Sequence, residues 1–412
     1  MTSISSSTSA EVPDTSIRNE ATLVVSSKTD GVELVHTVSS IATKRQRLRS
    51  LNWEGCIPVE ITLAQSSLSS PSMPPPLYRM VPRQTYLHIS LLDAIERLSM
   101  FAVTSPALLR QQQNGIINNT WLEDNCTKKP IRWHLFAGVL FDLSSSLPMG
   151  GRSVRQQLPW KLTLHFSSYP HDKILSLSNG LETIRQYYFN SLKQSLYMQY
   201  GNAKKSTSEI TKHHHDILWE SLKANNYGMF HSVNQHLQLT LENYDGSKTI
   251  VLPVRVLVDS LPVIQRPYRI TTSDSITTLR DNPITNGSDT MDTISENSIR
   301  NGGTLGDLLL DWLPHLFHEV ILTTRSKHDK STSTSTEQIC NVARSIQPKY
   351  PWITSLHNHT EVQPGPTPYR TTWVIQGITP SLQSSLLGLW YSLCHPDLFL
   401  YIIVRTTVQE DS

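Results

Sequence analysis

The residue best suited to take part in chemistry is Lys193, the single basic residue in the segment YYFNSLKQSLYM. A lysine amine can attack an activated carbonyl once it has lost its proton. With a pKa near 10.4, only about one free lysine in a few thousand is unprotonated at pH 7, so a partner or local desolvation must activate it. The alternative interpretation is an ordinary solvated lysine on the outer face of a helix.

Two further groups have the residue types of an active or metal site. His213, His214 and His215 are consecutive, but on a helix they point about 100° apart and cannot chelate one ion together. Cys394 and His395 combine a nucleophile with a base, yet adjacent residues seldom orient that way, so we expect a buried cysteine at a helix end. No GxGxxG, P-loop or HExxH pattern is present. We expect no metal, no cofactor and no enzymatic activity; an enzyme built on these groups is the remote alternative.

Composition narrows the class of protein. The 412 residues include 36 basic and 34 acidic side chains, a balance that argues against nucleic-acid binding. The 4 cysteines form no CxxC pair, which suits a reducing compartment. The first residues, MTSISSSTSAEVPDTS, lack the apolar core of a signal peptide, and no apolar run reaches the roughly 18–20 residues of a membrane span. We therefore expect a soluble, cytoplasmic protein.

The helix that would carry Lys193 has one apolar stripe. At about 100° per residue, one face collects Leu181, Ile184, Tyr188, Leu192 and Leu196. Lys193 falls on the opposite side, near Glu182, Gln186, Asn190 and Gln194. The pattern predicts an exposed lysine that is not crowded by other charges.

The order of predicted elements is similar in the two halves of the chain. In the first half, strand periods in CIPVEITLA, PLYRMVPR, NTWLEDN, IRWHLFA and WKLTLHF surround helical patterns in LLDAIERLSMFA and GVLFDLSS. In the second half, IVLPVRVLVD, LPVIQRPYRI, EVILTTR, TTWVIQGI and LFLYIIVR predict strands around the helices TLGDLLLDWLPHLF and SLLGLWYSL. Thr304 is a plausible N-cap, with Asp307 three residues on. This order is that of the ubiquitin-like β-grasp, although other α+β folds share parts of it.

The fold class is therefore α+β, with two ubiquitin-like β-grasp domains flanking a helix-rich domain. The predicted divisions are a disordered, Ser- and Thr-rich leader over 1–42, a helix over 43–54, a first ubiquitin-like domain over 55–172, a helix-rich domain over 173–246, and a second ubiquitin-like domain over 247–407. Polar inserts near 271–303 and 326–348 interrupt the second ubiquitin-like domain and are longer than ordinary loops.

A basic stretch within the predicted helix over 43–54 is a candidate contact for anionic lipid or for a partner. It contains Lys44, Arg45, Arg47 and Arg49. Each such charge near an anionic leaflet contributes about 1 kcal/mol. A solvated helix face, or one wall of a partner groove, is the alternative.

In combination, several segments resemble the autophagy protein 5 family. The resembling segments are PLYRMVPRQTYL, IRWHLFAGVLFDL, LPWKLTLHFSSYP, YYFNSLKQ, ILWESLKANNYGMF, LPVRVLVD with RPYR, GTLGDLLLDWLP and WVIQGITPSL with HPDLFLYIIV. They occur in the family's order across residues 52–406, and the long leader and inserts lie outside them.

The resemblance implies a scaffold in autophagosome formation that is not itself an enzyme. Lys193, the lysine of the resembling segment YYFNSLKQ, would accept the ubiquitin-like autophagy protein 12 through an isopeptide bond. The conjugate would act with autophagy protein 16, bound as a helix in a groove, as an E3-like factor for lipidation of autophagy protein 8 on phosphatidylethanolamine. Its other partners would be autophagy protein 10-type and 3-type conjugating enzymes, with peripheral association at the preautophagosomal membrane. The alternative is a β-grasp adapter that binds partners noncovalently and is never conjugated.

Overall fold

The computed structural model describes ten stretches of the chain, which are 43–103, 117–118, 120–144, 158–201, 210–237, 249–258, 261–271, 303–324, 341–348 and 369–408. The predicted leader and most of both predicted inserts lie outside the described residues. A helix over 43–54 opens the described part, as the sequence predicted.

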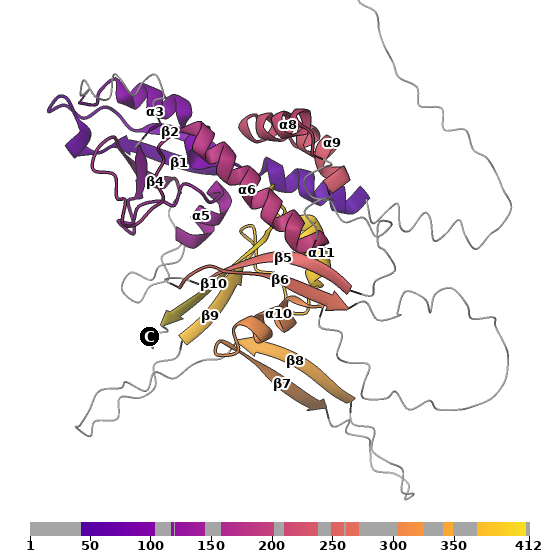
Figure 1. Cartoon of the computed structure of the whole chain (residues 1–412). Coiled ribbons are helices and arrows are strands. Elements are labelled where there is room, and N and C mark those ends of the chain that lie inside the picture. Colours follow the sequence, from indigo (N-terminus) through magenta and orange to yellow (C-terminus); the bar gives the residue numbers. More distant parts are fainter. Residues whose placement is uncertain are drawn as a thin grey trace, which may run out of the picture. The chain divides into compact units, whose positions relative to one another are not determined.

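The first sheet contains four strands (Figure 1). These are β1 (Cys56–Leu63), β2 (Leu77–Pro82), β3 (Trp121–Asp124) and β4 (Trp160–His165), in the order β2-β1-β4-β3. β1 runs antiparallel to β2 and parallel to β4. The predicted alternation in β1 is confirmed, since every second residue from Ile57 is buried. The short helices around this sheet are η1 (Gln65–Ser67), α2 (Leu87–Ser90), α3 (Leu92–Ser99) and α5 (Ala137–Ser144).

One predicted strand of the first half is wrong. IRWHLFA forms a loop with a turn, not a strand, and leads directly into α5. Its apolar side chains are held individually in the core: the indole of Trp133 donates to the carbonyl oxygen of Leu175 at 2.7 Å, and Phe136 is buried. Hydrophobic residues that fill a core from a loop do not alternate across a sheet, so their spacing gave a false strand signal.

The second four-stranded sheet repeats the arrangement of the first. It consists of β5 (Thr249–Val258), β6 (Ile264–Thr271), β9 (Tyr369–Val374) and β10 (Leu400–Val408), in the order β6-β5-β10-β9. β5 and β6 are two of the predicted strands and pair antiparallel, and β10 lies parallel to β5. Residues 400–404 are all buried, as expected of a strand covered on both faces. The predicted repeat of topology is confirmed.

A separate two-stranded sheet was only half predicted. β7 (Phe317–Thr324) matches a predicted strand, but its antiparallel partner β8 (Asn341–Pro348) lies at the end of what was predicted as a polar insert. The sequence NVARSIQP has little apolar alternation, and pairing with β7 supplies the order that its own pattern does not predict. The helices of this half are α10 (Leu305–Trp312) and α11 (Leu386–Leu393).

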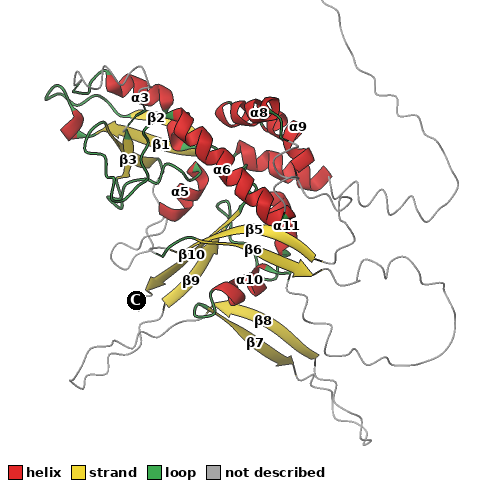
Figure 2. Cartoon of the chain, viewed as in Figure 1, coloured by secondary structure: helices red, strands yellow, loops and turns green. Residues whose placement is uncertain are grey.

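The helices that lie between β4 and β5 in sequence form the predicted helix-rich part of the chain (Figure 2). They are α6 (Leu181–Tyr200), α8 (Lys212–Lys223) and α9 (Tyr227–Leu237). α6 packs against β5 and β6, and α8 packs against α9. The helix over 43–54 contacts α9 through Trp53, whose ring centroid lies 4.8 Å from that of Phe230. No helix in the described part of the chain has the length and apolar character needed to cross a bilayer.

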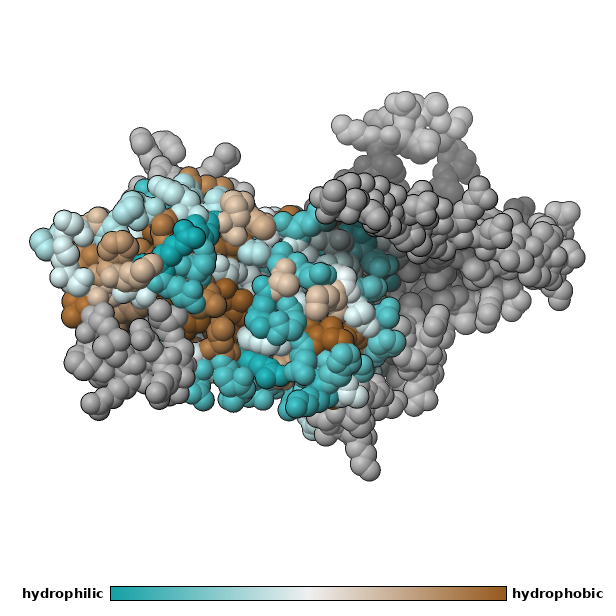
Figure 3. All heavy atoms as spheres, turned by 90° about the horizontal axis from the view of Figure 1, so that it is seen from above, coloured by the Kyte–Doolittle hydropathy of each residue, from teal (hydrophilic) through white to brown (hydrophobic). Residues whose placement is uncertain are grey.

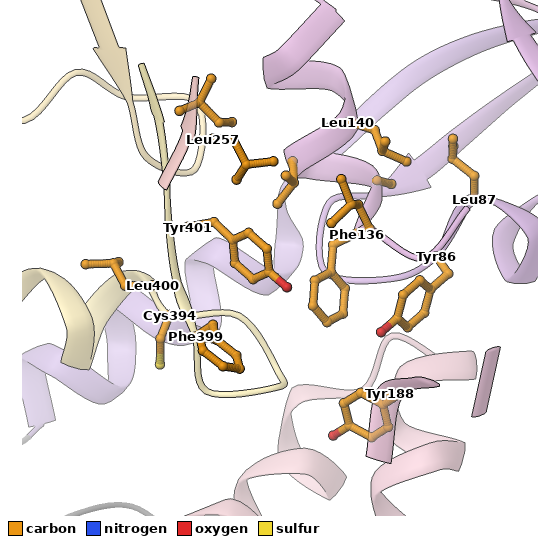
Figure 4. Close-up of a cluster of buried hydrophobic side chains, with 14 of the residues drawn as sticks. Tyr86, Leu87, Phe136, Leu140, Tyr188, Leu257, Cys394, Phe399, Leu400 and Tyr401 are labelled. Carbon is orange, nitrogen blue, oxygen red and sulfur yellow. The ribbon is translucent and has the colours of Figure 1, made fainter. Parts of the chain in front are cut away.

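Aromatic rings join the two β-sheet regions in the core (Figure 4). Phe136 stacks on Tyr86 at 4.8 Å between ring centroids and meets Tyr401 of β10 edge-on at 6.2 Å. Tyr188 of α6 is also fully buried in this region. On the face shown in Figure 3, hydrophobic side chains of the described residues lie among hydrophilic ones.

Candidate functional site

Lys193 is exposed near the middle of α6, as the sequence predicted. The predicted apolar stripe is buried at Ile184, Tyr188, Leu192 and Leu196. The helix ends at Gly201, which adopts a left-handed conformation at φ 63° and donates its N–H to Tyr197. Glycine adopts this conformation without the strain that a Cβ would cause, which explains where the helix stops.

α6 is buried over a wider arc than its apolar stripe predicted. Four further residues are also buried, and three of them are polar: Phe189, Ser191, Ser195 and Gln199. Lys193 therefore emerges from a restricted exposed strip that includes Glu182, Gln186, Asn190 and Gln194. Neighbouring parts of the fold therefore cover α6 on several sides, and the amine of Lys193 lies on the side that is exposed to solvent.

Two residues close to Lys193 on α6, one on each side of it in sequence, bind the second four-stranded sheet and its loops. The Ser191 hydroxyl donates to the carboxylate of Asp397 at 2.6 Å. The side-chain oxygen of Gln194 accepts from Arg255 of β5 at 3.4 Å and from Gln265 of β6 at 3.3 Å. The lysine thus lies on a segment that is anchored on both sides of it in sequence.

Asp397 is the centre of this buried network. Besides Ser191, it accepts from Arg255 at 3.2 Å, from the Tyr401 hydroxyl at 2.8 Å and from the backbone N–H of Phe399 at 3.3 Å. Burial raises the pKa of Asp397, while Arg255, Ser191 and Tyr401 oppose that rise. Burial acts to lower the pKa of Arg255, but Tyr401 and Asp397 outweigh it and raise that pKa, so the guanidinium stays charged.

The described residues agree with the prediction that no other charge crowds Lys193. No ion pair among the described residues involves Lys193, and Arg185 is paired instead with Asp216 at 2.9 Å. His215 of α8, however, packs its ring 4.5 Å from that of Phe189, one helical turn before Lys193. Burial lowers the pKa of His215, and Lys193 and Arg185 lower it further. A neutral imidazole near the amine is thus part of its surroundings.

The basic helix differs from the prediction at two of its four residues. Arg49 is buried and donates to the sulfur of Cys394 at 3.2 Å, so its interpretation as a surface contact for lipid is wrong. Arg45 is half-buried, with its guanidinium 4.9 Å from the ring centroid of Tyr391. Lys44 and Arg47 are exposed. The helical period brings Arg45 and Arg49, four residues apart, to the same side, which faces α11.

The two rival groups of residues do not form sites in the described part of the chain. Cys394 is buried at the end of α11, as predicted, and burial raises the pKa of its thiol. The ring of His395 stacks on Phe136 at 4.8 Å, and the sulfur of Cys394 accepts from Arg49. No cluster of three or more potential metal ligands occurs among the residues that the structure describes, the histidines of α8 included.

Sequence inspection missed the residues that anchor Lys193. One signal was available: Arg255 is the one charged residue in the apolar strand TIVLPVRVLV, and a buried arginine requires a partner. Nothing in the sequence indicated that the partner would be Asp397, which is 142 residues away.

Comparison with known proteins covers all three parts of the fold. Residues 52–166 match the model of "Autophagy protein ATG5, UblA domain", residues 181–240 match its "alpha-helical bundle region", and residues 289–404 match its "UblB domain". The autophagy protein 5 of Dictyostelium discoideum is 26% identical over 405 residues, which cover 85% of this chain and 93% of that protein. That of Oryza sativa subsp. japonica is 28% identical over 45% of this chain and 43% of its own length.

A solved structure agrees with the fold. The crystal structure of Kluyveromyces marxianus Atg5 is similar with a TM-score of 0.53 and 19% sequence identity, over 87% of this chain and 99% of that one. Two ubiquitin-like domains therefore flank a helical bundle region in the order that the sequence predicted. This chain belongs to the autophagy protein 5 family.

Proposed function

We propose that this member of an autophagy family is conjugated through Lys193 to autophagy protein 12 and then works as a non-catalytic, E3-like scaffold. The observation that carries the proposal is the position of Lys193: it is the lysine of the family-like segment YYFNSLKQ and is exposed on an anchored helix. With autophagy protein 16, the conjugate would promote lipidation of autophagy protein 8 on phosphatidylethanolamine.

The proposed bond forms by aminolysis of a thioester. The modifier's carboxyl-terminal glycine arrives as a thioester on the cysteine of a conjugating enzyme of the autophagy protein 10 type. Once the Lys193 ammonium has lost a proton, its nitrogen attacks the thioester carbonyl carbon, the C–S bond breaks, and an isopeptide C–N bond forms. The nitrogen gives up a second proton, and the enzyme's cysteine leaves as a thiol. Arginine cannot replace Lys193, because its guanidinium stays protonated.

The remaining partners follow from the same proposal. Autophagy protein 16 would bind as an amphipathic helix in a groove, using apolar anchors at i, i+3 or i+4, and i+7. A conjugating enzyme of the autophagy protein 3 type would supply the catalytic cysteine for lipid transfer. The scaffold would be cytoplasmic and reach the preautophagosomal membrane as a peripheral protein, for which exposed Lys44 and Arg47 are the remaining basic candidates.

Mass spectrometry after co-expression with the modifier and its two conjugation enzymes tests the proposal. We expect a shift by one modifier mass that maps to Lys193, is lost in Lys193→Arg and persists in Lys212→Arg, a matched change at an exposed lysine of α8. An unmodified wild-type chain, in cells that modify a known acceptor, would favour the noncovalent adapter. A shift that survives Lys193→Arg would refute the assigned site.

A further inference from the structure

The hydrogen bonds beside Lys193 determine which way that side of α6 faces. Successive residues of a helix are about 100° apart, so Ser191 and Lys193 point roughly 200° apart around the axis. Ser191 is buried and donates to Asp397, which directs Lys193 outward. Gln194, about 100° further on, is held by Arg255 and Gln265. Two anchors at different angles fix the rotation of the helix about its own axis.

The anchors are more directional than the packing around them. The apolar side chains of α6 contribute to stability in proportion to buried area, and such contacts tolerate small rotations. A hydrogen bond of 2.6 Å to a buried carboxylate does not tolerate such rotations, because a hydrogen bond weakens steeply when its donor and acceptor are misaligned. The carboxylate is itself held by Arg255, Tyr401 and the N–H of Phe399, so it is a fixed reference point.

The stability of the fold does not by itself explain why charged groups are buried at this place. Burying two charges costs several kcal/mol per ion, and apolar replacements of similar volume are often as stable or more so. The network does join α6 to three parts of the second ubiquitin-like domain: β5 through Arg255, the 394–399 loop through Asp397, and β10 through Tyr401. Its arrangement suits the task of orientation.

We infer that Ser191 and Asp397 are positioning residues for the acceptor amine: they hold α6 at the rotation in which Lys193 reaches the incoming thioester. This inference rests on the proposed function, since it concerns how the acceptor Lys193 is oriented for conjugation. Neither residue contacts the reacting atoms. Both act through the backbone of α6.

Ser191→Ala tests the inference, and the structure offers a matched control. Ser195→Ala makes the same change one turn later in the same helix, at another buried serine whose hydroxyl bonds only to Leu192 within α6. Single-turnover conjugation, with the modifier preloaded as a thioester on the conjugating enzyme, separates the maximal rate from the concentration of half-saturation. Thermal unfolding of each variant measures stability in parallel.

We expect Ser191→Ala to lower the maximal conjugation rate roughly tenfold, because misplacing a reacting group by about 1 Å can cost up to about 100-fold. Half-saturation should change little, and Ser195→Ala should retain the wild-type rate. If the wild-type chain is conjugated at Lys193 and Ser191→Ala and Ser195→Ala are conjugated at equal rates, the positioning role is refuted and the proposed function is left intact. A wild-type chain that is never modified at Lys193 would refute both.

A double-mutant comparison checks that Ser191 acts through Asp397. If it does, Ser191→Ala combined with Asp397→Ala should lower the rate no more than Asp397→Ala does alone, because alanine at 397 has no acceptor for the Ser191 hydroxyl. Multiplied effects would mean that Ser191 acts by another route and would overturn the assignment of Asp397. Should Asp397→Ala not fold, the comparison of Ser191→Ala with Ser195→Ala still decides whether Ser191 positions the lysine.

Discussion

At the scale of single residues, burial decides what an ion pair contributes. Arg79 and Asp93 approach to 2.6 Å, but their side chains are 25% and 52% exposed. Arg255 and Asp397 are further apart, at 3.2 Å, and only 6% and 1% exposed. Exposed pairs contribute about 0–1 kcal/mol, whereas removing one partner of a buried pair leaves an uncompensated charge. The longer contact is therefore the more important one.

We predict that Asp397→Ala lowers the free energy of unfolding by about 3–5 kcal/mol. The matched change Asp93→Ala should cost at most about 1 kcal/mol. Equilibrium denaturation of both variants measures the difference. Equal losses would show that Arg255 is reached by water or finds another partner when the carboxylate is removed.

The exposure of Lys193 could be predicted from the sequence, whereas its anchoring could not. A helical period is local, and Ile184, Tyr188 and Leu192 already indicate which side of α6 is buried. Ser191 and Asp397 are 206 residues apart, and their contact exists only because α6 packs on the second ubiquitin-like domain. Contacts of this kind depend on how elements meet, which no local pattern encodes.

At the scale of elements, the start of α10 shows a local signal that the fold retains. The Thr304 hydroxyl accepts the N–H of Asp307, and the Asp307 carboxylate accepts the N–H of Thr304, both at 3.1 Å. This capping box was expected from the spacing of the two residues, and it is confirmed. α11 has a simpler cap, in which Ser385 accepts from Gly388 at 3.3 Å.

We predict that Thr304→Ala destabilises the second ubiquitin-like domain by about 1 kcal/mol, since it removes the hydroxyl that accepts the N–H of Asp307 and donates to its carboxylate. Ser385→Ala should cost less, because it removes a single, longer hydrogen bond. Thermal midpoints of the two variants give the comparison. A larger loss for Ser385→Ala would contradict the reciprocal box as the stronger cap.

Elements with a strong local period were predicted well, and those set by their neighbours were not. β1 and β5 have the alternation or apolar run that a strand requires. β8 acquires its conformation by pairing with β7, and the loop over 131–136 is held by side-chain contacts such as that of Trp133 with Leu175. In both cases the deciding interaction comes from outside the segment.

At the scale of the whole described fold, polar and aromatic contacts join the two ubiquitin-like domains. Asp142 of α5 pairs with Arg83 of the first domain and accepts the N–H of Gly377 of the second at 2.8 Å. His395 of the second domain stacks on Phe136 of the first. Burial, Arg83 and Arg255 lower the pKa of His395 well below its ordinary value. His395 is therefore a neutral histidine, buried where the two ubiquitin-like domains are in contact.

Neutral buried histidines make the stability of the fold sensitive to acid. Burial lowers the pKa of His88 to about 4, and burial with Arg132 and Arg255 does the same for His134. Between pH 6.5 and 4 the unfolded chain binds more protons than the folded one, so the free energy of unfolding falls as the pH falls. For His88 the loss reaches about 3 kcal/mol, at about 1.4 kcal/mol per pKa unit.

The contribution of His88 can be isolated by comparing how steeply the free energy of unfolding changes with pH in the wild type and in a His88 variant. Asp142 and Asp397, whose pKa values burial raises, contribute with the opposite sign, so the wild-type curve alone is a sum. We predict that His88→Gln flattens the dependence of unfolding free energy on pH between 6.5 and 4, whatever it does to stability at pH 7. The matched change His171→Gln, at an exposed histidine, is the control for replacing an imidazole by an amide. Parallel curves for His88→Gln and wild type would mean that the His88 imidazole is protonated within the folded core, with a partner or water that satisfies its charge.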